Sequence, residues 1–258
     1  MRLRVCHLYP DLLNLYGDRG NVLVLCRRAA WRGIRVELEA VSLGECVRFT
    51  DYDLVFVGGG ADLEQGLVAR DLSRKGPYLI EAAQAGVVIL SICGGYQLLG
   101  RFYRTREGRE IPGIGLFDIH TEAGEKRLKG NVLLEADPEL VAEMRRINPG
   151  APATLVGYEN HSGRTFLGSG VRPLGRLLKG YGNNGGDSGE GAWIKNAFGT
   201  YLHGPLLSKN PHFADLFICR ALSRRYGEVS LAPLDDSLEL QAHEVAKNRL
   251  LKSRQGKI

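Results

Sequence analysis

Two hydrophobic periodicities alternate along the first hundred residues. Short apolar runs have the spacing of buried or half-buried strands, and the stretches between them have the spacing of amphipathic helices. The expected strands are 3–9, 35–40, 53–57 and 87–92, and the expected helices are 21–31, 77–85 and one that begins at 96–99. This order predicts an α/β protein with a Rossmann-like, doubly wound, mostly parallel sheet. Ligands of such sheets bind beyond the carboxyl ends of the strands.

The second half of the chain is richer in short strand-like runs, and two helices close it. The expected strands are 131–135, 154–158, 191–195 and 198–202, and the expected helices are 211–226 and 237–251. Residues 182–191 are rich in Gly, Asn, Asp and Ser, which predicts an exposed, mobile loop. Neither an internal repeat nor a long linker divides the sequence. We therefore expect one domain over residues 1–258, with a C-terminal helical segment at about 211–251.

Composition narrows the class of protein. Hydrophobic residues make up 44% of the chain and charged residues 24%, which is typical of a folded globular protein. The net charge of +5 is spread along the sequence, so we expect no nucleic-acid partner and a solvated basic end at 252–257. The five cysteines include no C-x-x-C pair, so we expect neither a disulfide framework nor a metal site. Without a signal peptide or an apolar run of ~20 residues, we expect a cytoplasmic protein with no transmembrane segment.

Cys93 has the sequence context of a catalytic nucleophile. The most strand-like run of the chain ends at Cys93, and two glycines and the start of a helix follow it. The segment Ser91-Ile-Cys-Gly-Gly95 therefore predicts a nucleophile elbow. The positive end of the helix favours a thiolate, and the N–H of Gly94 would face an oxyanion on the attacked carbonyl. The alternative is a buried, inert cysteine beside a turn, which is what we expect of the other four cysteines.

A second glycine-rich loop is the expected partner of this elbow. Gly58-Gly-Gly60 follows another expected strand, and an oxyanion hole usually needs a second donor, so Gly59 and Gly60 are candidates. The alternative is a tight turn without a ligand. The loop does not satisfy G-x-G-x-x-G, and the chain has no P-loop motif. If the reaction of this chain is coupled to ATP, a partner therefore has to bind the ATP.

The general base should be a histidine, because imidazole activates a thiol near neutral pH. His203 follows a strand-like run, and the turn-forming Gly204 and Pro205 come next, so its ring is expected at a strand end. His161 lies in a similar context and is the rival base. The remaining histidines are expected to be structural or exposed.

Cys93, the glycine loop and His203 together resemble the class I, triad-type glutamine amidotransferases. Gly157-Tyr-Glu-Asn-His161 resembles the cobyric acid synthase branch of that class. Within this branch, residues 8–21 and 201–206 resemble amidotransferase subunits that serve a Mur-ligase-like synthetase, and the resemblance runs from about Val5 to Ala246. It implies that Cys93 is the nucleophile, His203 the base and Arg127 the residue that binds glutamine. The alternative for Arg127 is a solvated charge.

The resemblance also implies a partner and a product. The Mur-ligase-like partner, MurT, would form a heterodimer with this chain, carry ATP and Mg²⁺, and amidate the D-glutamate of the lipid II stem peptide in peptidoglycan synthesis. This chain would need no cofactor, and it would approach the membrane only through lipid II. Three alternatives stay open. They are an amidotransferase for another synthetase such as one of the cobyric acid type, a free-standing cysteine peptidase or γ-glutamyl hydrolase, and a non-catalytic scaffold.

The chain departs from the triad pattern at one position. Triad amidotransferases generally carry a carboxylate two residues after the base histidine, and here that residue is Pro205. Either a distant acid orients His203, with Glu159 a candidate, or the partner supplies one, as is thought for the family that the chain resembles. The missing acid predicts that the isolated chain is a poor glutaminase that its partner activates.

Overall fold

The structure is a computed structural model that describes residues 1–252, apart from the side chain of Asp62. Residues 253–257 of the expected basic tail lie outside the described residues. The helices are α1 (Arg19–Trp31), α2 (Asp62–Gln84), α3 (Gly94–Leu98), α4 (Pro138–Ile147), α5 (Pro211–Tyr226) and α6 (Ser237–Lys252), and the 3-10 turns are η1 (Leu15–Gly17), η2 (Phe49–Asp51) and η3 (Leu206–Ser208).

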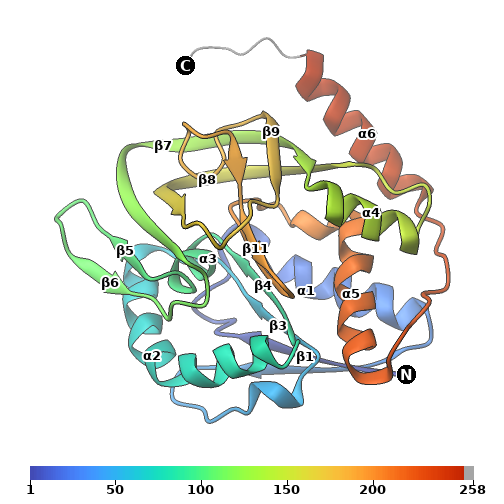
Figure 1. Cartoon of the computed structure of the whole chain (residues 1–258), viewed down its shortest axis with the longest axis horizontal. Helices are drawn as coiled ribbons and strands as arrows, with labels where there is room; N and C mark the ends of the chain where they lie inside the picture. Colours follow the sequence, from blue (N-terminus) through green and yellow to red (C-terminus); the bar gives the residue numbers. More distant parts are fainter. Residues whose placement is uncertain (253–258) are drawn as a thin grey trace.

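A mostly parallel sheet forms the centre of the protein, which confirms the predicted fold class (Figure 1). Its strands are, in spatial order, β11 (Ala192–Ile194), β12 (Ala197–Thr200), β4 (Val88–Ile92), β3 (Leu54–Val57), β1 (Arg2–Leu8) and β2 (Arg35–Val41). All neighbouring pairs are parallel except β11 with β12. Because β1 connects to β2 on one side and β3 lies on the other, the strand order reverses between β1 and β3. A crevice for ligands is expected at such a switch point.

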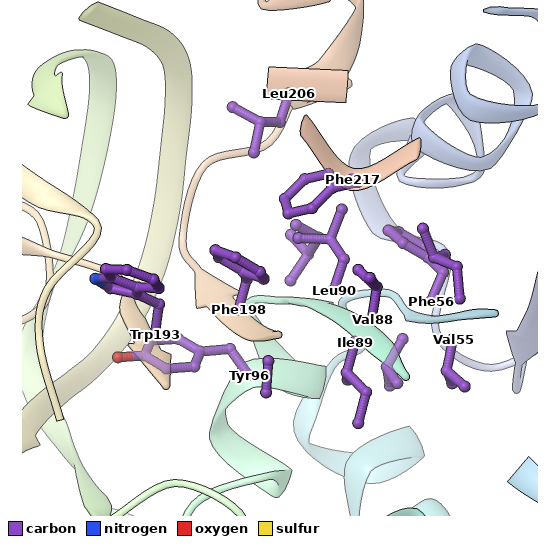
Figure 2. Packing of buried hydrophobic residues seen from close by; sticks show 14 of the residues in the cluster. Val55, Phe56, Val88, Ile89, Leu90, Tyr96, Trp193, Phe198, Leu206 and Phe217 are labelled. Atoms are coloured by element: carbon purple, nitrogen blue, oxygen red, sulfur yellow. The ribbon is translucent and has the colours of Figure 1, made fainter. Parts of the chain in front are cut away.

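The core lies on both faces of this sheet. Helices α1 and α5 cover one face and α2 covers the other (Figure 1). Val88 and Leu90 of β4 point toward Phe217 of α5, whereas Ile89 between them points to the opposite face with Val55 of β3 (Figure 2). All five side chains are fully buried. A strand buried on both faces needs apolar residues at every position, which explains the continuous apolar run of β4.

A second, largely antiparallel sheet lies beside the first (Figure 1). Its strands are β5 (Phe102–Arg104), β6 (Glu110–Pro112), β7 (Ile119–Ala136), β8 (Thr154–Leu167), β9 (Gly175–Lys179) and β10 (Gly189–Glu190). The pairing of β7 with β8 dominates it, and the register shifts between Ala123 and Leu128. The strands expected at 131–135 and 154–158 were therefore too short. The glycine and charged residues of this irregularity hide the strand pattern of β7.

Two other predictions about local structure were wrong in part. Helix α2 begins at Asp62 and not at Pro77, because its buried apolar face outweighs the Gly76-Pro77 interruption. Gly76 also allows a close approach, since a Cβ there would lie 2.7 Å from Ile114 Cγ2. In the loop expected to be exposed, residues 185–188 are exposed but Asn183 is fully buried and hydrogen bonded to the backbone of residue 191.

A buried ion cluster ties the C-terminal part of the chain to α1. The guanidinium of Arg28 pairs with Asp215 of α5 at 2.7 Å and with Asp236, just before α6, at 2.6 Å. Arg32, directly after the end of α1, pairs with Asp215 at 2.7 Å. At least 94% of each of these four side chains is shielded from solvent. The cluster therefore joins α1, α5 and the start of α6 in one place.

Candidate active site

Four segments that are distant in sequence meet at the carboxyl edge of the parallel sheet. Strands β1, β3, β4 and β12 are consecutive neighbours in that sheet, so the loops that leave them lie side by side. The residues that these loops bring together are Asp18, Gly58–Gly60, Cys93 and His203.

Cys93 occupies a sharp turn between β4 and α3. Its φ is 49° and its ψ is −108°, a conformation that residues other than glycine rarely adopt and that is found at functional sites. Its N–H donates to the carbonyl of Thr200 at 2.8 Å, and the N–H of Gly95 donates to Gly58 at 3.1 Å. Cys93 is buried, with 7% of the residue exposed. The turn thus presents the thiol at the sheet edge, as an elbow requires.

His203 is held in place through both its backbone and its ring. Its N–H donates to the carbonyl of Tyr158 at 2.7 Å, and its Nδ1 lies 3.0 Å from Oδ1 of Asp18. Burial by itself would lower the pKa of His203, but the hydrogen bond that its ring donates to Asp18 and the neighbouring Cys93 raise it to about 10. Nε2 of His203 has no hydrogen-bond partner within residues 1–252. The arrangement therefore favours a charged His203 imidazolium beside the Cys93 thiol, and it leaves Nε2 available to transfer a proton.

Gly59 lies at the centre of this group. Its N–H donates to Oδ2 of Asp18 at 2.9 Å, so one carboxylate holds both the histidine and the glycine loop. A Cβ at Gly59 would lie 3.2 Å from Asp18, from Cys93 and from His203, and only glycine leaves room for all three. Because Asp18 already accepts from the N–H of Gly59, only Gly60 and Gly94 of the three glycines expected to bind an oxyanion remain candidates. A Cβ at Gly94 would lie 3.0 Å from the nitrogen of Gly60.

Arg127 lies on β7, within the segment where the register shifts, and is exposed. Its Nε and Nη2 donate to Oδ1 and the carbonyl of Asn160, at 2.9 and 3.1 Å. Nδ2 of Asn160 donates to the hydroxyl of Tyr16 at 2.6 Å, and the ring of Tyr16 contacts that of His203. Arg127 is thus connected to His203 through two side chains.

Within residues 1–252, no hydrogen bond or ring contact joins Glu159 or His161 to the ring of His203. The two carboxylate oxygens of Glu159 accept hydrogen bonds from the N–H groups of residues 181 and 182 at 2.7 and 2.9 Å. His161 stacks on Tyr201 with 3.6 Å between ring centroids, and its Nδ1 is 2.8 Å from the carbonyl of Gly163. Burial lowers the pKa of His161. Glu159 therefore holds the loop after β9, and His161 joins β8 to Tyr201, which follows β12 of the parallel sheet.

Asp18 is the member of this site that sequence reasoning missed. It is separated from His203 by 185 positions, and no motif links the two. The available signal was positional. Asp18 lies in the loop after the first strand, and β1 is the neighbour of the strand that leads into the glycine loop.

Within the described part of the chain, no group of three or more His, Cys, Asp or Glu side chains is placed to hold a metal. None of its helices is both long and apolar enough to span a membrane.

Comparison with known proteins finds similarity to glutamine amidotransferases in both sequence and fold. Residues 4–211 match the CobB/CobQ-like glutamine amidotransferase domain. The chain is 40% identical to lipid II isoglutaminyl synthase (glutamine-hydrolyzing) subunit GatD of Staphylococcus aureus (strain N315), over 98% of this chain and 99% of that protein. It is 37% identical to the protein of the same name in Streptococcus pneumoniae (strain ATCC BAA-255 / R6), over 94% and 90%. The glutaminase domain of Trypanosoma brucei CTPS has a similar fold, with a TM-score of 0.52 and 11% identity over 90% and 96% of the two chains.

Proposed function

Because the chain belongs to the CobB/CobQ-like glutamine amidotransferase family, we propose that it releases ammonia from glutamine through a Cys93 thioester. We further propose that the ammonia serves a Mur-ligase-like partner, MurT, which amidates the D-glutamate of the lipid II stem peptide in the cytoplasm. Two relatives named as subunits of lipid II isoglutaminyl synthase support this, because the similarity covers nearly the whole of each protein. In this proposal ATP and Mg²⁺ bind to the partner.

The first half of the reaction forms the thioester. The Cys93 thiolate attacks the side-chain amide carbon of glutamine, and the N–H groups of Gly60 and Gly94 stabilise the oxyanion of the tetrahedral intermediate. The His203 imidazolium then gives its Nε2 proton to the amide nitrogen. The C–N bond breaks, ammonia leaves, and the carbonyl carbon stays bonded to sulfur.

The second half regenerates the site. Neutral His203 takes a proton from water, and the resulting hydroxide attacks the thioester carbon. The C–S bond breaks, glutamate leaves, and the Cys93 thiolate again faces an imidazolium. Asp18 accepts the Nδ1 hydrogen bond throughout, which fixes the tautomer of His203 and stabilises its charged form.

The observation that carries this proposal is the buried contact of Asp18 with His203 beside Cys93. The acid that the sequence did not reveal is present within the chain, and it occupies the Nδ1 side of the ring. This removes our reason for expecting the isolated chain to be a poor glutaminase. We now expect the purified chain to hydrolyse glutamine without a carboxylate from the partner.

A glutaminase assay with a matched cysteine control tests the chemistry. Cys93→Ala should abolish glutamine hydrolysis, whereas Cys46→Ala, at an exposed free cysteine, should leave it unchanged. Mass spectrometry of the parent after acid quenching during turnover should find the glutamyl group on the peptide that contains Cys93. Activity of Cys93→Ala within about tenfold of the parent would exclude the thioester route.

A reconstitution separates the proposed acceptor from its rivals. The chain, a co-purified Mur-ligase-like protein, ATP, Mg²⁺ and lipid II are combined with glutamine labelled with ¹⁵N in its amide. Label in the amidated D-glutamate residue supports the proposal, and label only in free ammonia contradicts it. Cleavage of γ-glutamyl peptides by the isolated chain would instead favour the hydrolase alternative. Capture of a cobyric acid type synthetase from the native cell would favour the other amidotransferase.

A further inference from the structure

A short strap lies over the candidate active site. It consists of residues 14–18, between β1 and α1, and two successive residues in it have left-handed backbones, Tyr16 with a φ of 53° and Gly17 with a φ of 77°. Two hydrogen bonds fix the strap to Gly59. The N–H of Leu15 donates to the carbonyl of Gly59 at 3.0 Å, and Asp18 accepts from the N–H of Gly59. This backbone turns Tyr16 toward His203 and Asn160.

The side chain of Tyr16 bridges two parts of the site. Its ring meets that of His203 edge to face, with centroids 4.9 Å apart and an angle of 70° between the planes. Its hydroxyl accepts from Nδ2 of Asn160 at 2.6 Å. The residue is 44% exposed, so it forms the outer surface here, whereas His203 beneath it is completely buried.

Asn160 divides its hydrogen bonds between Tyr16 and Arg127. Its side-chain amide nitrogen binds Tyr16, and its two oxygens accept from Nε and Nη2 of Arg127. These bonds occupy the Nε–Nη2 edge of the guanidinium, and Nη1 has no hydrogen bond within residues 1–252. The Nη1–Nη2 edge is therefore left for a ligand, and a carboxylate prefers a planar pair of N–H donors of this kind. Asn160 therefore fixes the direction in which Arg127 presents its charge.

We propose that Tyr16 is a positioning residue that sets the distance between the two ends of the glutamine site. The inference rests on the proposed function, in which the amide of glutamine reacts at Cys93 beside His203 and its α-carboxylate binds Arg127. Tyr16 contacts His203 at the first end and, through Asn160, holds Arg127 at the second. If the two ends are held apart in this way, asparagine, which is shorter by one methylene, should fit them less well than glutamine.

Removal of the Tyr16 hydroxyl tests this link without removing the ring. Tyr16→Phe should raise KM for glutamine about three- to tenfold and leave kcat within about twofold, because it frees Asn160 and Arg127 but keeps the cover on His203. The preference for glutamine over asparagine, as a ratio of kcat/KM values, should fall by a similar factor. Tyr78→Phe makes the same chemical change at another exposed tyrosine and should alter neither value.

A double-substitution cycle separates this coupling from a general loosening of the strap. Asn160→Ala should raise KM at least as much as Tyr16→Phe, because Asn160 also holds Arg127 directly. In the Asn160→Ala background, Tyr16→Phe should change KM by less than about twofold, since the link is already broken. Fully additive effects, or a KM for Tyr16→Phe within about twofold of the parent, would overturn the proposal.

Alkylation of Cys93 provides a readout that does not need turnover. Iodoacetamide has no α-groups, whereas 6-diazo-5-oxonorleucine carries those of glutamine. Tyr16→Phe should slow inactivation by the second reagent about three- to tenfold and leave the rate with the first unchanged. An equal effect on both would overturn the role of Tyr16. If the parent reacts with both reagents but hydrolyses no glutamine, the proposed function fails and the comparison still tests Tyr16.

Discussion

Substitution of Asp18 by asparagine tests the centre of the site most directly. The two carboxylate oxygens of Asp18 accept from Nδ1 of His203 at 3.0 Å and from the N–H of Gly59 at 2.9 Å. Asparagine keeps the shape but has a single acceptor oxygen, so its NH₂ group must face one of these two donors. If it faces His203, the ring must adopt the other tautomer, which places a hydrogen on Nε2 and prevents it from accepting a proton.

The expected loss of kcat and of stability follows from this geometry. The corresponding aspartate-to-asparagine change in a serine protease lowers kcat about 10⁴-fold because it imposes the wrong tautomer. In Asp18→Asn the amide can also turn its NH₂ toward Gly59, which spares His203, so we expect kcat for glutamine hydrolysis to fall by about 10²- to 10⁴-fold. The buried donor left without a partner should lower the free energy of unfolding by about 1–3 kcal/mol.

The assay compares three proteins. Glutamate release is measured for the parent, Asp18→Asn and Asp11→Asn, with urea unfolding curves for each. Asp11 is an exposed acid in the same N-terminal segment, so its variant controls for the loss of one negative charge. If Asp18→Asn retains kcat within about threefold of the parent, Asp18 does not orient His203. The acid would then have to come from a partner, as the sequence alone had led us to consider.

Three other predictions concern the neighbouring groups. His203→Ala should abolish glutamine hydrolysis, whereas His161→Ala should mainly reduce stability because it removes the stack on Tyr201; the reverse pattern of kcat values would show that the base was misassigned. Arg127→Ala should raise KM for glutamine far more than it lowers kcat, and an unchanged KM would return Arg127 to a solvated charge. The pKa of His203 is raised from 6.5 to about 10, so its stabilising effect is fully present below pH ~6.5 and is lost as the pH rises to about 10. Urea unfolding of the parent and His203→Gln should therefore differ most at pH 6, and a difference independent of pH would contradict the raised pKa.

Local patterns were sufficient to predict the parallel sheet and the elbow. The apolar run of β4 has to be buried on both faces, and it ends at Cys93 followed by glycines, so position and conformation can both be inferred from adjacent residues. The turn at Gly204 and Pro205 predicted equally well that His203 stands at a strand end. These inferences succeeded because each depends on a few consecutive side chains.

The features that could not be predicted depend on contacts between distant segments. Asp18 reaches His203 only because β1 and β12 lie in one sheet, and no periodicity encodes a contact across 185 positions. The length of β7 was missed because its irregular centre, with Gly124 and three consecutive charged residues, breaks the alternation that identifies a strand. Helix α4 was not predicted, although Asp137 caps it by accepting from the N–H of Glu139 at 2.8 Å.

The ion cluster around Arg28 makes the charge balance of the protein interior depend on the C-terminal segment. Two guanidinium groups and two carboxylates occupy this site, so it is electroneutral only while Asp236 is present. Asp236 lies beyond the end of the family match at residue 211. Removal of the residues after 227 would leave Arg28 and Arg32 to share one counter-ion in a nearly dry environment, where an uncompensated charge is strongly destabilising. A shortened chain that retained Asp18, Cys93 and His203 would therefore carry an excess positive charge at the C-terminal end of α1, the helix that begins directly after Asp18.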